Sequence, residues 1–317
     1  MTRLSGAADY ADELTNCPVR YVLTDDLVRL CTELAYSKGA RTLACADLLR
    51  FPATRLWVEW AQAPQRETLA TCRATDSHEQ ATDAFGRRGA WIRASSDGKR
   101  GVLRTFWTVG SSDTDILASS MEAYFDLDTC TDPPDPFDGD REGSLAVFEH
   151  EDSQADLLRR CFRFRYEKSW AAYYDSATLS PLKRAAIART ALGTIAIDVP
   201  VLIAFFLLLG TRCGLPQRPL SLMRLNRTRA RAGKPLLLDH VEVLSPLLQP
   251  HSSDVSEPSK GYRRAPRLHH VRGHLFRRGN QLFWRVPHMR GTARAGAIRS
   301  RTVTWTFDGH SARSSPS

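Results

Sequence analysis

An apolar run from Val201 to Gly210 is the feature that most restricts how this chain of 317 residues can fold. The run holds three successive leucines and two adjacent phenylalanines, and Asp198 and Pro200 separate it from the apolar residues before it. Its length is about 10 residues, whereas a bilayer-spanning helix needs about 20. The pattern therefore predicts a helix buried in the core of a soluble protein, without a membrane span.

The cysteines and the short motifs restrict the chemistry. Seven cysteines lie far apart and are never spaced as C-x2-C, which argues against a disulfide scaffold and a cysteine zinc site and favours a reducing, cytoplasmic environment. The sequence contains no G-x-G-x-x-G, no G-K-[ST] and no nucleophile elbow. We therefore expect no cofactor, and a role other than that of an enzyme is favoured.

Charge is distributed very unevenly along the chain. Residues 1–210 hold 24 basic and 30 acidic residues, whereas residues 211–317 hold 20 basic and 5 acidic residues. Between residues 258 and 307 there are 12 basic residues, four histidines and no acidic residue. A solvated protein surface normally mixes both signs, so this segment predicts a polyanionic partner.

The first part of the chain predicts an α+β domain over residues 1–145. Thr24 and two aspartates open an amphipathic helix, and Leu56–Trp60 has the composition of a strand. The turn Ser95–Gly98 lies between two apolar segments and predicts a β-hairpin, and Ile116–Leu127 predicts another strand. An Asp- and Pro-rich stretch at 126–143 then predicts a loop.

A helical section is predicted over residues 146–247. Its helices would cover Asp156–Tyr174, a segment that starts at Ser180-Pro181 and leads into the apolar run, and Leu220–Arg231. The last helix would carry three arginines on one face, at spacings of three and four: Arg224, Arg227 and Arg231.

Strands are predicted again near the end of the chain. Leu238–Leu244 partly alternates, Arg267–Phe276 and Leu282–Val286 flank a turn, and Arg301–Phe307 alternates polar and apolar residues. Residues 258–317 thus form a basic β-hairpin region. The expected fold class is α+β: an N-terminal helix with an antiparallel sheet, a central helical section and a small basic β element.

The histidines of the basic region allow a catalytic hypothesis. His270 and His274 would share a face of one strand. A metal site is not expected, because the segment supplies no cysteine or carboxylate and its arginines repel a cation. Metal-independent RNA cleavage remains open, with acid–base candidates His269, His274 and His288 and a phosphate held by Arg272 or Arg290.

Nucleic-acid binding is the second functional hypothesis for this region. Arginines contact phosphates, and exposed aromatic rings stack on unpaired bases. The alternative is that Phe276, Phe283 and Trp284 form the apolar face of a small sheet. The candidate nucleic-acid-binding residues are Arg264, Arg267, His269, Arg272, His274, Arg277, Trp284, Arg285, His288 and Arg290.

The string from Arg267 to His274, followed by Phe283–Pro287, resembles the C-terminal element of a family of phage and mobile-element proteins. That family includes an anti-CRISPR repressor of the type V-A effector nuclease. The shared pattern is R-x-H-x-x-R-G-H and then an aromatic strand that ends in proline, and the matching residues are Arg267, His269, Arg272, Gly273, His274 and Pro287. The sequence departs from the pattern at Leu275 and over residues 226–244.

The resemblance implies a regulator that acts during translation, engages a nascent polypeptide and causes loss of the target message. Together with the charge pattern, it leads to the hypothesis of a phage-type, anti-CRISPR-like protein. Such a protein would bind RNA or the translating ribosome through its basic end and a polypeptide through its acidic half. The alternatives are a metal-independent endoribonuclease and an inhibitor that binds an acidic protein partner.

Overall fold

The computed structural model describes residues 11–36, 43–73, 85–109, 116–128, 161–167, 170, 180–212, 214–234, 236–246, 267–271, 273–285, 288–290 and 292–297. The chain forms two compact units. The first comprises residues 1–247 together with 274–285, and the second comprises residues 248–273 and 286–317. These groupings differ from the three predicted sections, because part of the basic end belongs to the first unit.

Among the described residues, the first unit contains one large sheet, a separate two-stranded sheet formed by β11 and β12, and several helices. The helical elements are α1 (Ala11–Thr15), α2 (Asp25–Tyr36), the 3-10 helix η2 (Leu43–Leu48), α3 (Gln62–Arg73), α7 (Pro181–Ala196), α8 (Val199–Leu209) and α9 (Met223–Arg231). The strands are β1 (Val19–Leu23), β2 (Arg55–Ala61), β3 (Phe85–Ala94), β4 (Arg100–Val109), β5 (Ile116–Ala118), β6 (Met121–Asp126), β7 (Phe162–Tyr166), β8 (Gln217–Leu220), β9 (His240–Val243), β11 (His274–Arg278) and β12 (Gln281–Arg285).

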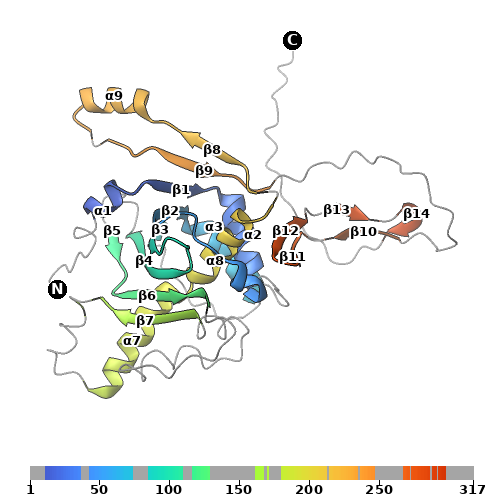
Figure 1. Cartoon of the computed structure of the whole chain (residues 1–317), viewed down its shortest axis with the longest axis horizontal. Coiled ribbons are helices and arrows are strands. Elements are labelled where there is room, and N and C mark those ends of the chain that lie inside the picture. Colours follow the sequence, from blue (N-terminus) through green and yellow to red (C-terminus); the bar gives the residue numbers. More distant parts are fainter. Residues whose placement is uncertain are drawn as a thin grey trace, which may run out of the picture. The chain divides into compact units, whose positions relative to one another are not determined.

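The large sheet is mixed. Its strand order is β7-β6-β4-β3-β2-β1-β9-β8, with β5 paired to β4 (Figure 1). The strand β1 runs parallel to β2 and to β9, while the other pairs are antiparallel. A parallel pair needs a crossover connection, which α2 provides between β1 and β2. The α+β class is confirmed, and the expected antiparallel sheet is corrected to a mixed one.

The core of the first unit is built around α8. Every residue from Val199 to Leu208 is buried, and α8 packs against α2. The Phe205 ring lies 5.7 Å from that of Tyr21, and the Phe206 ring lies 4.8 Å from that of Phe51. Thr190–Leu209 is long and apolar enough to cross a membrane, but most of it is buried inside the protein. The predicted core helix is therefore confirmed.

A buried polar network fixes α8 to the sheet and to α3. Asp198, which precedes α8, is fully buried and accepts a hydrogen bond of 2.5 Å from Arg88 of β3, whose side chain is 7% exposed. Its other carboxylate oxygen accepts from Gln65 of α3 at 3.1 Å. Burial raises the pKa of the Asp198 carboxyl, and the Arg88 guanidinium opposes that rise.

Several predicted elements are confirmed. The α2 helix starts with two aspartates, α7 starts at Pro181 with Ser180 as its N-cap, and β3 and β4 form the predicted hairpin. The Ser180 hydroxyl accepts a hydrogen bond of 3.4 Å from the Lys183 amide. The predicted helix at Leu220–Arg231 and strand at Leu238–Leu244 correspond to α9 and β9.

Two predictions for the middle of the chain are wrong. Residues 162–166, placed in a helix by their apolar content, form β7, because phenylalanine and arginine alternate there with a period of two. The buried side chains of β7 are Phe162 and Phe164, which share one face of the sheet. The strand expected at Ile116–Leu127 is two strands, β5 and β6, separated at Ser119 and Ser120.

The second unit contains a small sheet in its described part. The strand β10 (Arg267–Val271) lies between β13 (His288–Arg290), to which it is antiparallel, and β14 (Thr292–Ala297), to which it is parallel. The continuous strand expected over Arg267–Phe276 is therefore wrong, since β10 ends at Val271 and β11 begins at His274. His270 and His274 consequently do not share a strand face.

Three predicted segments lie wholly or partly outside the described residues. These are most of the Asp- and Pro-rich loop at 126–143, the ends of the helix proposed for Asp156–Tyr174, and the strand at Arg301–Phe307.

The buried ion pair yields a stability prediction. Replacing Arg88 by Met should leave the Asp198 carboxylate buried without its cation and lower the free energy of unfolding by about 3–5 kcal/mol. Urea unfolding followed by tryptophan fluorescence measures this change. Arg87→Met is the matched control, since Arg87 pairs with Glu59 in a partly exposed position and its loss should cost at most about 1 kcal/mol. Equal effects of the two substitutions would contradict the proposed role of the buried pair.

Candidate nucleic-acid interface

The hairpin β11–β12 carries the best-described part of the basic end. It pairs His274 with Arg285 at its open end and Arg278 with Gln281 at its turn. Gly279 adopts a φ of 60°, which the tight turn requires and glycine tolerates without strain. The predicted turn is thus confirmed, and strand alternation gives the hairpin two different faces.

The inner face of the hairpin attaches it to the core of the first unit. Leu282 and Trp284 are buried, and β12 contacts both α8 and η2. The Arg212 amide, which follows α8, donates a hydrogen bond of 3.1 Å to the Leu282 carbonyl. Trp284 is only 7% exposed, so its ring cannot stack on a base. Its predicted binding role is corrected to a packing role.

The outer face combines aromatic rings with cations. Phe276 and Phe283 are cross-strand partners. Their rings are stacked, with centres 5.2 Å apart and an interplanar angle of 16°. The Arg285 guanidinium lies 5.5 Å from the centre of the Phe276 ring, and the His274 ring lies 6.3 Å from it. Arg278 and Gln281 lie on the same face at the turn, and Arg278 is exposed. The phenyl rings are partly exposed and flanked by arginines.

Arg277 differs from its neighbours because an acidic residue neutralises it. Its guanidinium lies 2.7 Å from a carboxylate oxygen of Asp47 in η2. This contact attaches the turn of the hairpin to the N-terminal part of the first unit. The prediction that Arg277 contacts nucleic acid is therefore weakened, since its charge is already paired.

A cationic hollow adjoins the turn of the hairpin. Its volume is about 590 Å³, and its lining includes Arg50 and Arg212 but no carboxylate. The remaining lining residues come from η2, α8 and the hairpin: Leu48, Phe206, Leu207, Gly210, Asn280, Gln281 and Leu282. Both arginines are exposed, and the hollow lies where the turn of the hairpin meets η2 and the end of α8.

The remaining candidate residues are described less completely. In the second unit, His269 is paired with Arg290, and His288 is paired with Val271, on adjacent antiparallel strands. Arg290 is exposed, and Arg267 is paired with Thr292 of β14. Arg264 and Arg272 lie outside the described residues.

The catalytic candidates are distributed over both units. His269 and His288 lie on neighbouring strands of the second unit, whereas His274 belongs to the first. The three candidate histidines therefore come from three different strands, β10, β11 and β13. A pair formed by His269 and His288 remains open as a prediction.

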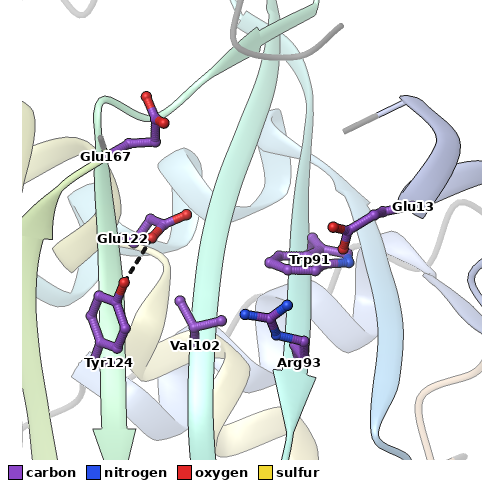
Figure 2. A pocket seen from close by; sticks show the side chains of 7 residues that line it. All are labelled: Glu13, Trp91, Arg93, Val102, Glu122, Tyr124 and Glu167. Atoms are coloured by element: carbon purple, nitrogen blue, oxygen red, sulfur yellow. Dashed lines mark hydrogen bonds between the residues drawn. The ribbon is translucent and has the colours of Figure 1, made fainter. Parts of the chain in front are cut away.

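The opposite charge gathers in a second pocket of the first unit. Figure 2 shows Glu122 and Tyr124 of β6 across β4 from Trp91 and Arg93 of β3. Its volume is about 280 Å³, and Glu13, Glu167 and Val102 complete the lining.

Aromatic rings in this pocket lie close to charged groups. The Tyr124 hydroxyl donates a hydrogen bond of 3.1 Å to Glu122, and burial together with this carboxylate raises the Tyr124 pKa. The Arg93 guanidinium lies 5.6 Å from the centre of the Trp91 ring. The Arg165 guanidinium lies 5.3 Å from the centre of the Tyr124 ring, so each ring already has an arginine beside it. Three glutamates and one arginine line the pocket, which leaves it with an excess of negative charge.

No family model, curated protein or solved structure matches this chain. The local geometry therefore carries the functional argument. Sequence reasoning left Phe276, Phe283 and Arg278 out of the candidate site and included Trp284. The signal that separates them is the period-two alternation of β12, in which Leu282 and Trp284 share the buried face and Phe283 lies on the other.

The packing role of Trp284 is testable. Trp284→Ala should lower the free energy of unfolding by about 3–5 kcal/mol, because it opens a cavity beneath the hairpin. Trp284→Phe should cost much less, since the ring nitrogen of Trp284 makes no hydrogen bond within the described part of the chain. Chemical unfolding measures both. An alanine variant of unchanged stability that nevertheless loses RNA binding would show that Trp284 acts in recognition instead.

Proposed function

We propose that this protein binds single-stranded RNA through the outer face of the β11–β12 hairpin and acts as a regulator of gene expression. The observation that carries the proposal is the stacked pair Phe276–Phe283 with Arg285 over the Phe276 ring. Partly exposed rings stack on bases of any identity, and arginines beside them hold the backbone phosphates.

The charges around this face support the same partner. Arg278 and Arg285 are exposed, and no described ion pair joins either of them to a carboxylate. The cationic hollow with Arg50 and Arg212 lies at the hairpin turn. Release of counterions from a nucleic acid by such a surface gives affinity that decreases steeply with salt.

The acidic pocket of Figure 2 supports recognition of a polypeptide as a second activity. Carboxylates from Glu13, Glu122 and Glu167 would attract a lysine or arginine side chain, and the exposed ring of Tyr124 would contact its aliphatic part. A nascent polypeptide with a basic residue is the partner that this chemistry fits.

The resemblance of residues 267–287 to a family of phage and mobile-element proteins supplies the biological context of the proposal. In that context, a cytoplasmic protein would engage RNA on or near the ribosome and a nascent polypeptide, and would thereby lower expression of its target. The proposal assigns the two activities to separate surfaces of the first unit.

Two alternatives lead to different outcomes. A metal-independent ribonuclease would cleave labelled RNA in EDTA, with His269 and His288 as the pair to test. An inhibitor that binds an acidic protein would keep its partner after RNA and DNA have been digested. Binding of intact RNA that is lost on nuclease treatment favours the proposal over both.

The hairpin face is tested by charge reversal. Arg278→Glu combined with Arg285→Glu should weaken binding of a labelled single-stranded RNA at least about tenfold and reduce the slope of log affinity against log salt by about 2. Fluorescence anisotropy over a series of KCl concentrations measures both quantities. Phe276→Leu with Phe283→Leu should weaken binding while leaving that slope nearly unchanged, because stacking is lost but charge is kept.

The control lies in the same hairpin. Arg277→Gln, Arg278→Gln and Arg285→Gln each remove one positive charge, but Arg277 is already paired with Asp47, so its exchange should change RNA affinity far less than either of the other two. Equal losses at all three arginines would mean that net charge alone attracts RNA and that the outer face is not the site. Unchanged affinity in the double variant would exclude the hairpin altogether.

A further inference from the structure

The segment from β8 through α9 to β9, residues 217–243, is an arm at one edge of the large sheet. Figure 1 shows α9 at the end of the ribbon formed by β8 and β9. The strand β9 pairs with β1, and β8 pairs with β9 alone among the described strands. None of the residues of α9 is buried, although a helix of 9 residues has little stability of its own.

Specific hydrogen bonds hold the helix in place on this arm. The Asn226 side chain donates to the Leu237 carbonyl at 2.7 Å and accepts from the Leu237 amide at 2.8 Å. At its end, Gly233 adopts a φ of 63°, and the Gly233 and Lys234 amides bond to the Ala230 and Arg229 carbonyls. This pairing is a Schellman cap, which fixes the last turn. The arm is therefore ordered without contributing a side chain of α9 to a core.

The ordered helix presents an arginine stripe: Arg224, Arg227 and Arg231. At 1.5 Å per residue the stripe is about 10 Å long, and its spacings of three and four place the three side chains on one face. All three are exposed, and none forms an ion pair with a carboxylate in the described part of the chain. Asn226, which contacts the returning chain, lies on another face.

The acidic residues of the arm are already engaged within it. Glu242 pairs with Arg218, and Asp239 accepts a hydrogen bond of 2.7 Å from the Leu222 amide. The helix itself contains no acidic residue. Residues 217–243 hold six basic and two acidic residues, so the arm keeps an excess of positive charge whose complement is a polyanion.

The composition of the arm distinguishes it from the hairpin. Residues 214–246 contain no phenylalanine, tyrosine or tryptophan, and the single imidazole of this segment, His240, lies on β9 away from α9, with its Nδ1 3.1 Å from the Leu238 carbonyl oxygen. Double-stranded RNA hides its bases and is recognised mainly through its shape, phosphates and 2′-hydroxyls. We infer that the arginine stripe of α9 binds the phosphate backbone of double-helical RNA.

This inference goes beyond the proposed function, because it assigns a second site with another ligand. The hairpin suits unpaired bases and the arm suits paired stems. A structured message or a ribosomal RNA offers both.

The test uses the full-length protein and two labelled probes, an RNA hairpin with a fully paired stem and an unstructured single-stranded RNA. Arg224→Glu, Arg227→Glu and Arg231→Glu together should weaken binding of the paired stem at least about tenfold and lower its salt slope by about 3. Binding of the single strand should change much less. Circular dichroism and thermal unfolding establish that the variant is folded.

Two matched variants complete the design. Exchange of the same three arginines for lysine keeps the charge and should keep most of the affinity for the stem. Exchange of the exposed Leu225, Leu236 and Leu238 for serine should leave that affinity unchanged. The inference is wrong if the leucine variant alone loses binding of the stem. It is also wrong if the arginine variant still binds the stem but no longer binds anionic vesicles or an acidic protein, because the arm would then dock to a membrane or a protein.

The test of the arm can fail or succeed independently of the test of the hairpin. Loss of stem binding in the arm variant, with no binding of single-stranded RNA by the unaltered protein, would support the arm and exclude the proposed hairpin function. Unchanged stem binding in the arm variant would exclude the arm whatever the hairpin does.

Discussion

The fully buried carboxylate of Asp198 organises the first unit. Because a buried charge needs a cation and hydrogen bonds, α8 can occupy the core only where Arg88 of β3 and Gln65 of α3 meet it. The network extends further, since Gln65 accepts a hydrogen bond from Trp60 of β2 and Tyr36 of α2 donates to the Ile197 carbonyl. The position of α8 in turn determines where the hairpin packs, because Leu282 and Trp284 are buried beside its C-terminal end.

Local patterns in the sequence predicted those elements whose stability is local. The apolar run at 201–210, the cap at Ser180 and the turn at Ser95–Gly98 each carry their own physical signal, and the structure contains the elements they predict. Pairing between strands that are far apart in the sequence was harder to predict. Nothing in β1 or β9 indicates that they run parallel to each other, and β7 was misread because its apolar content was weighed above its period of two.

The candidate site could be predicted only in part, because it too depends on how strands pair. The excess of arginine near the end of the chain was visible, but the break at Gly273 and the faces of the hairpin depend on register. Because a shift of one residue along a strand exchanges its buried and exposed sets, the sequence alone does not tell whether Phe283 or Trp284 faces solvent. The pairing of Arg277 with Asp47 joins residues 230 positions apart, and composition cannot reveal it.

The central claim is that exposed arginines beside the stacked phenyl rings form an RNA-binding face. Ultraviolet crosslinking in the native cell, followed by mass spectrometry of the crosslinked peptides and sequencing of the RNA, tests it most directly. We predict RNA attached within residues 274–285, and especially at Phe276 or Phe283, whose rings would lie against bases. Recovery of RNA crosslinked only elsewhere in the chain, or of a protein partner without RNA, would contradict the account.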